Sequence, residues 1–133
     1  MNLAYENRYD REPSVPIRVR YTLTGREVVV DAVVDTGSNV TMLEGWLAGF
    51  LGLDLGSADQ ANVVGVGGVL AGVAMAEVEI QVLRRPELST FVVAAFLPTD
   101  APPMGSLIGT DVLEHLDFGL AHSNRMLYFG LPV

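Results

Sequence analysis

The sequence contains no cysteine among its 133 residues. This absence excludes disulfides, thiolate metal sites and a cysteine nucleophile, and it fits a reducing cytoplasm, where we expect the protein to work. Aromatic residues are also scarce at 8%, although half of all residues are hydrophobic. The core is therefore expected to be aliphatic, and the many valines together with 14 glycines predict short strands and tight turns.

Basic residues are few as well. Eight Lys and Arg face 16 Asp and Glu, which gives a formal net charge of −8. The largest basic cluster is the pair Arg84-Arg85. Because a protein needs a basic face to neutralise phosphates, nucleic acid is not expected as a partner. The acidity is interpreted as a contribution to solubility.

A long hydrophobic run is missing too. The longest uncharged stretch, residues 60–76, is rich in glycine and shorter than a membrane span, so no membrane segment is expected. The polar first ten residues lack the apolar core of a signal peptide. The length fits one domain, which we place at residues 17–133 after a flexible N-terminal leader, residues 1–16.

The hydrophobic pattern is that of strands. Residues 17–23 alternate between apolar and polar side chains, which predicts a half-buried strand. Residues 28–34 are apolar at nearly every position, which predicts a strand buried on both faces, and Thr24-Gly25 predicts the turn between them. Residues 44–53 predict a weak helix or compact loop with Trp46 in the core. Further strands are expected at 71–83, 88–97, 107–108, 118–121 and 126–129, and a short helix at 109–116.

The chemistry is expected at Val33-Val34-Asp35-Thr36-Gly37-Ser38. A carboxylate directly after a buried strand is costly, so such a group must be paired, hydrogen-bonded or partly protonated. Gly37 permits a sharp turn and a close approach of another chain. The alternative is a plain turn, in which Asp35 and Ser38 bind only local backbone groups.

Two later features favour the chemical interpretation. A glycine-rich hairpin with its turn at Gly65–Gly68 is followed by Leu107-Ile108-Gly109, again an apolar pair before a glycine and a helix. This order, which spans roughly residues 17–130, resembles the retropepsin-like aspartic peptidases. The resemblance implies an all-β closed or half-closed barrel with a flap hairpin and one short C-terminal helix. Retroviral members usually carry Asp in place of Asn39 and Arg in place of Thr110. The Gly-x-Asp-x-Leu form of Gly109–Leu113 is more similar to cell-encoded or bacterial single-domain members.

The resemblance also implies residue roles. Asp35 matches the catalytic acid, Thr36 the residue whose hydroxyl links the two active-site loops of a dimer, and Gly37 the residue whose carbonyl lies along the bound peptide. The substrate-binding positions that it implies are Ser38, Asn39, Val66, Gly67, Gly68, Met104 and Leu107. Asp111 is expected to hydrogen-bond the start of the helix.

Only one Asp-Thr-Gly is present, although aspartic peptidases need two carboxylates that share a proton. Asp31 lies within a strand pattern and Asp111 within a helix pattern, so the second carboxylate is expected from Asp35 of another copy in a homodimer. The expected activity is endopeptidase cleavage of peptides or unfolded protein segments, without a metal or an organic cofactor. Two alternatives stay open: a catalytically weak dimerisation or peptide-binding module on the same fold, and a half-enzyme that pairs with a different subunit.

A metal site at His115 and His122 is conceivable from their proximity to Glu114 and Asp117. The spacing matches no ligand pattern, and we expect two surface histidines instead.

Overall fold

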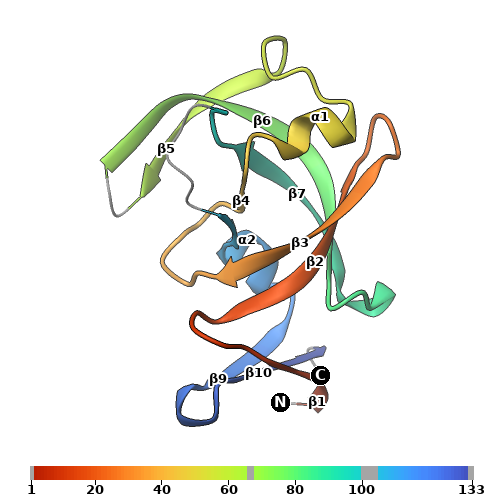
Figure 1. Cartoon of the computed structure of the whole chain (residues 1–133), viewed down its shortest axis with the longest axis vertical. Coiled ribbons are helices and arrows are strands. Elements are labelled where there is room, and N and C mark those ends of the chain that lie inside the picture. The colour runs from red at the N-terminus through yellow and green to blue at the C-terminus, as the bar shows by residue number, and fades with distance from the viewer. Residues whose placement is uncertain (1, 66–67, 100–104, 132–133) are drawn as a thin grey trace.

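A computed structural model of the chain describes residues 2–65, 68–99 and 105–131 (Figure 1). Strands dominate the described part. They are β1 (Asn2–Arg8), β2 (Ser14–Tyr21), β3 (Glu27–Val34), β4 (Met42–Leu43), β5 (Asp59–Gly65), β6 (Gly68–Val82), β7 (Ser89–Phe96), β8 (Ser106–Ile108), β9 (Asp117–Ala121) and β10 (Met126–Leu131). The α-helices are α1 (Leu47–Leu51) and α2 (Thr110–Leu113), and Pro86–Leu88 and His122–Asn124 form single 3₁₀ turns.

Six strands close into a barrel in the order β2-β3-β8-β4-β7-β6, because β2 also pairs with β6. β5 extends this sheet beyond β6 and forms with it a long hairpin. The predicted all-β closed barrel is confirmed. The described residues contain two short helices where the resemblance implied one, and the additional one, α1, lies in the segment predicted as a weak helix or compact loop.

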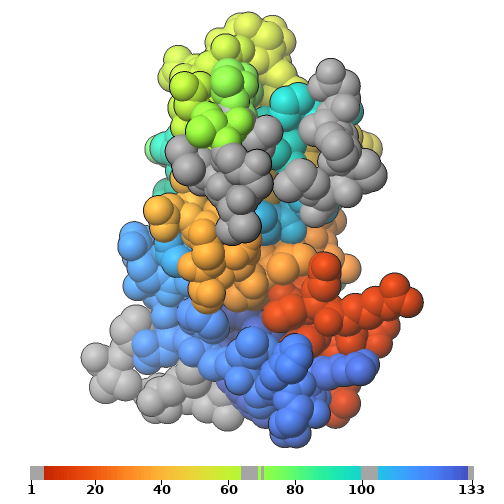
Figure 2. All heavy atoms as spheres, turned by 90° about the vertical axis from the view of Figure 1, so that its left-hand side faces the viewer, coloured from red at the N-terminus to blue at the C-terminus, as the bar shows by residue number. Residues whose placement is uncertain are grey.

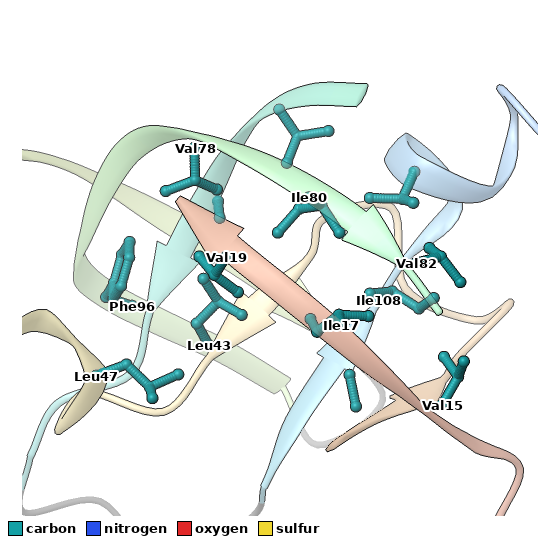
Figure 3. Close-up of a cluster of buried hydrophobic side chains, with 14 of the residues drawn as sticks. Val15, Ile17, Val19, Leu43, Leu47, Val78, Ile80, Val82, Phe96 and Ile108 are labelled. Carbon is teal, nitrogen blue, oxygen red and sulfur yellow. The ribbon is translucent and has the colours of Figure 1, made fainter. Parts of the chain in front are cut away.

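Alternation along β2 explains how the barrel fills. Val15, Ile17 and Val19 are buried, whereas Arg18 and Arg20 between them are only half-buried. The buried valines and isoleucines of the neighbouring strands β2 and β6 lie side by side and point into the barrel, where residues of β4, β7, β8 and α1 join them (Figure 3). Burial of this aliphatic surface is the main force that holds the sheet closed.

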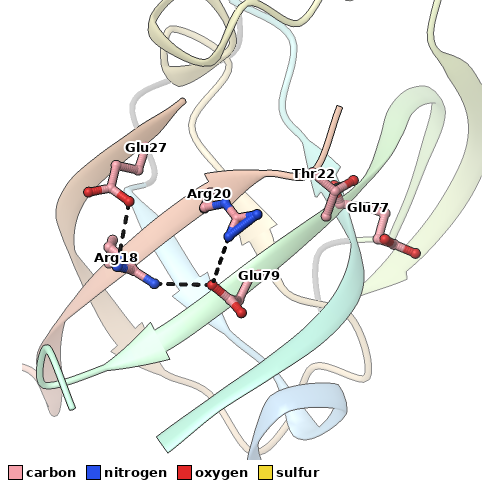
Figure 4. A network of polar contacts seen from close by, with 6 residues as sticks. All are labelled: Arg18, Arg20, Thr22, Glu27, Glu77 and Glu79. Carbon is pink, nitrogen blue, oxygen red and sulfur yellow. Dashed lines mark hydrogen bonds and ion pairs between the residues drawn. The ribbon is translucent and has the colours of Figure 1, made fainter. Parts of the chain in front are cut away.

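Ion pairs line the outside of the seam where the barrel closes (Figure 4). Arg18 on β2 lies 3.0 Å from Glu79 on β6 and 3.5 Å from Glu27 on β3, and Arg20 lies 3.8 Å from Glu79. Partly exposed pairs of this kind contribute about 0–1 kcal/mol each. Their contribution to the stability of the fold is therefore small beside that of the buried aliphatic core.

Two predictions about burial were wrong. β3 was expected to be buried on both faces, but only Ala32 is buried and Val29 is 43% exposed, because one face of each barrel strand points outward. Trp46 was expected in the core but is 49% exposed. It packs edge-on against Phe50 on the outer side of α1, with ring centroids 5.6 Å apart, while the helix buries Leu47 and Leu51.

The first residues also differ from expectation. The segment 1–16 was predicted to be a flexible leader, but β1 pairs with β10 in a separate three-stranded sheet of order β1-β10-β9. The next residue, Tyr9, is 5% exposed and its N–H donates to the Arg125 carbonyl. β2 begins at Ser14, inside the same segment. Backbone pairing holds β1, and this needs no apolar alternation in its sequence.

Among the residues that the structure describes, no helix is long and apolar enough to cross a membrane.

Candidate active site

The position of β8 in the sheet determines the geometry of the site. β8 lies between β3 and β4, the two strands that flank the loop of residues 35–41. Val34 of β3 is the parallel partner of Ile108 in β8, and Met42 of β4 is the antiparallel partner of Leu107. Because β3 and β8 run in parallel and end together, the polar residues that follow each strand emerge at the same edge of the barrel.

Asp35 is the first residue beyond this edge. Its N–H donates to the Ile108 carbonyl at 3.0 Å, so the backbone stays tied to β8 as the strand ends. The half-buried Asp35 carboxylate accepts one hydrogen bond at Oδ1, from the Gly37 N–H at 2.9 Å. In the described part of the chain, no hydrogen bond reaches Oδ2 and no basic side chain forms an ion pair with this carboxylate.

The alternative of a plain turn is thus correct in one respect. Asp35 does bind its own loop, and the Ser38 N–H closes the turn by donating to the Asp35 carbonyl at 3.3 Å. Among the residues that the structure describes, this one local bond leaves Oδ2 without a hydrogen-bond partner. Thr36 and Gly37 at the tip of the turn are exposed. The Asp35 carboxylate and the exposed Thr36 hydroxyl therefore lie on a loop whose backbone is held by its hydrogen bond to β8.

The second half of the loop is held by β8 and α2. The Ser38 carbonyl accepts a hydrogen bond from the Thr110 N–H at 2.8 Å, and the Ser38 hydroxyl donates to the Val40 carbonyl at 2.7 Å. Three residues further on, the Thr41 hydroxyl and N–H both donate to the Asp111 carboxylate, at 2.7 and 2.9 Å. The loop is thereby attached to the β8–α2 junction at several points along its length.

Gly109 makes this attachment possible. A Cβ atom at position 109 would lie 2.6 Å from the Ser38 carbonyl oxygen and 3.0 Å from the Val40 carbonyl. No side chain fits at that distance, so the apolar-apolar-glycine motif exists because two backbones cross here in direct contact.

The structure brings some of the predicted substrate-binding residues to this loop. Asn39 is exposed, and its Oδ1 lies 3.5 Å from the Thr110 hydroxyl. Leu107 is half-buried on β8 against a small apolar cluster separate from the main core. The buried members of this cluster are Met42, Val63, Val73, Ala95 and Leu97. They join the hairpin strands β5 and β6 to β4 and β7, and Val40 of the loop packs against the same cluster.

Gly68 begins β6 and pairs with Gly65, the last residue of β5, so the two strands of the predicted hairpin are present. The hairpin and the loop of residues 35–41 lie on the same side of the barrel, at the left of Figure 1 and facing the viewer in Figure 2. The predicted positions Val66, Gly67 and Met104 lie outside the described residues.

Sequence reasoning missed one contact that supports the loop. Asp111 does hydrogen-bond the helix start as predicted, since its Oδ1 accepts the Val112 N–H at 2.9 Å. Its bonds to Thr41, 70 positions away, were not predicted. A signal was present, because Thr41 is a lone hydroxyl within the apolar run Val40–Leu43 and a buried hydroxyl needs a partner.

No protein-family model matches the sequence, and no curated protein matches it either. The fold nevertheless belongs to a known class, the retropepsin-like all-β barrels. The chain is similar to the crystal structure of a retropepsin-like aspartic protease from Rickettsia conorii, with a TM-score of 0.65 and 17% sequence identity. The match covers 94% of this chain and 88% of that one. At this identity the similarity shows the fold alone.

Proposed function

We propose that this chain is an aspartic endopeptidase that acts as a homodimer, with Asp35 of each subunit supplying one of two catalytic carboxylates. One observation carries the proposal. Asp35 follows a barrel strand directly, on a loop tied to β8 and α2, and keeps one carboxylate oxygen free of hydrogen bonds within the described residues. This oxygen can accept a hydrogen bond from a water molecule or from a protonated second carboxylate.

The chemistry requires two such groups in different protonation states. One ionised Asp35 removes a proton from a water molecule, whose oxygen attacks the carbonyl carbon of the scissile peptide bond. The partner subunit's Asp35, protonated, donates its proton to the carbonyl oxygen, which gives a tetrahedral diol. Proton transfer to the leaving nitrogen then breaks the C–N bond, and the shared proton is restored to the pair.

The other loop residues have roles that fit their exposure. Thr36 and Gly37 are exposed in the single chain, so a second copy and a bound peptide can reach them. Ser38, Asn39 and Leu107 border the same edge and would contact the substrate. The β5–β6 hairpin would act as a flap that covers the peptide and excludes water. The partly buried Leu107, which packs against the apolar cluster, would favour aliphatic substrate side chains next to the cut.

A digest of a peptide library by the wild type and by Asp35→Asn tests the proposal, with sedimentation in the same buffer. Asp31→Asn is the matched control, since it removes the same charge from an exposed position on β3. We expect cleavage by wild type and Asp31→Asn, none by Asp35→Asn, and dimers in all three.

Cleavage by Asp35→Asn at the wild-type rate contradicts the assignment of this site. Peptide binding without cleavage by the wild type favours the binding module instead. Cleavage by a wild type that remains monomeric at high concentration refutes the shared pair of carboxylates.

A further inference from the structure

Thr41 is a fully buried polar residue, with 0% of its surface exposed. Its hydroxyl donates to Asp111 Oδ1 at 2.7 Å and accepts the Gly109 N–H at 3.2 Å. Its own N–H donates to Asp111 Oδ2 at 2.9 Å. The hydroxyl and the N–H of Thr41 therefore both point at the β8–α2 junction, and burial makes each of these bonds costly to lose.

Asp111 completes the connection from the other side. Its two oxygens accept three hydrogen bonds, from the Thr41 hydroxyl, the Thr41 N–H and the Val112 N–H. A side chain that only capped α2 would bind the helix backbone alone. This carboxylate instead spans two elements and joins the start of β4 to the start of α2.

The same junction holds the catalytic end of the loop. Asp35 donates its N–H to the Ile108 carbonyl at 3.0 Å, two residues before Thr110, whose N–H binds the Ser38 carbonyl at 2.8 Å. Both ends of the loop of residues 35–41 are thus tied to one short segment, residues 108–112. Because Gly109 lies in direct contact with the Ser38 and Val40 backbone, this segment cannot move without moving the loop.

We propose that Thr41 and Asp111 are positioning residues, which set the place of the Asp35 carboxylate through the loop backbone. This inference rests on the proposed function, since two Asp35 groups must meet within hydrogen-bonding reach. A displacement of about 1 Å at a catalytic group can cost about 100-fold in rate. Loss of the Thr41 hydroxyl is therefore expected to lower kcat more than it changes KM.

Three variants separate positioning from general stability. Thr41→Val keeps the volume but removes the hydroxyl, which leaves the Gly109 N–H without its acceptor. Thr41→Ser keeps the hydroxyl and is the conservative rescue. Glu114→Gln is the control, because it removes a carboxylate from the exposed end of α2 that takes no part in the Thr41 contacts.

The experiment measures kcat and KM per folded dimer, well below the melting temperature, and amide hydrogen exchange of residues 35–41. For Thr41→Val we expect kcat about 10- to 100-fold lower, KM within about threefold, and exchange about tenfold faster in this loop. Thr41→Ser and Glu114→Gln are expected to match the wild type within about threefold in all three quantities.

Wild-type kcat in Thr41→Val overturns the inference, and so does unchanged exchange in residues 35–41. Both results leave the peptidase proposal intact if Asp35→Asn is inactive. If the wild type itself cleaves nothing, the proposed function fails, and exchange alone decides whether Thr41 and Asp111 hold the loop.

Discussion

Two segments of this chain look alike in sequence and differ in what their acids do. Val33-Val34-Asp35-Thr36-Gly37 and Leu107-Ile108-Gly109-Thr110-Asp111 both place a carboxylate shortly after an apolar pair. Within the described residues, the Asp35 carboxylate accepts one local hydrogen bond, whereas that of Asp111 accepts three from two elements. Asp111 therefore connects two parts of the fold, whereas the Asp35 carboxylate binds only its own turn.

The difference follows from the position of the glycine. In the second segment Gly109 comes directly after the strand, so the backbone there crosses the loop of residues 35–41 in close contact. Asp111 then lies in the first turn of α2. In the first segment the acid comes directly after the strand and the glycine two residues later, so the carboxylate stays at the edge. The segment that follows β8 thus supports the loop, whereas the segment that follows β3 forms the exposed loop itself.

The largest expected effect separates the two acids. Asp35→Asn should lower kcat about 1000-fold or more, since it removes the acid–base pair, and should leave the denaturant midpoint nearly unchanged because Asn still accepts the Gly37 N–H. Asp111→Asn should instead cost about 1–3 kcal/mol of unfolding free energy, because its amide donors meet the donors of Thr41 and Val112, and should keep measurable activity. Kinetics and urea unfolding check both, and the reverse pattern contradicts the comparison.

A second prediction concerns the apolar pairs. Ile108 is fully buried, whereas Val34 is only half-buried. Ile108→Ala should cost about 2–5 kcal/mol through the cavity that it leaves, and Val34→Ala about 1 kcal/mol. Equal losses of unfolding free energy in urea would show that the two strands support the site equally, against this account.

A third prediction compares the two glycines, and Gly37 is expected to give the smallest effect of all. Gly109→Ala should cost about 1–3 kcal/mol, since the new Cβ would meet the Ser38 carbonyl. Gly37→Ala should cost about 0.5 kcal/mol or less, because the nearest atom is the Asp35 Oδ1 at 3.2 Å. The stability of both variants by thermal unfolding tests this order, and a larger loss in Gly37→Ala would contradict it.

Local patterns predicted much of the fold. The alternation in β2, the turn at Thr24-Gly25 and the hairpin at Gly65–Gly68 are all encoded within a few neighbouring residues. β1 was missed because its polar sequence is held by backbone pairing with β10, more than a hundred residues away. The Thr41–Asp111 contact was missed for the same reason, because 70 positions separate the two residues. The loop that carries Asp35 could be predicted from its own residues. The contacts that hold this loop against β8 and α2 could not, because they form only when the barrel closes.

The shared pair of carboxylates is the central claim, and mixing subunits tests it most directly. Wild type is combined with a ninefold excess of Asp35→Asn under conditions that allow exchange, and cleavage is measured per wild-type chain. If each site needs Asp35 from both subunits, only dimers of two wild-type chains are active, and the rate per wild-type chain falls to about one tenth. An unchanged rate per wild-type chain would contradict the account, because one subunit would then carry a complete site.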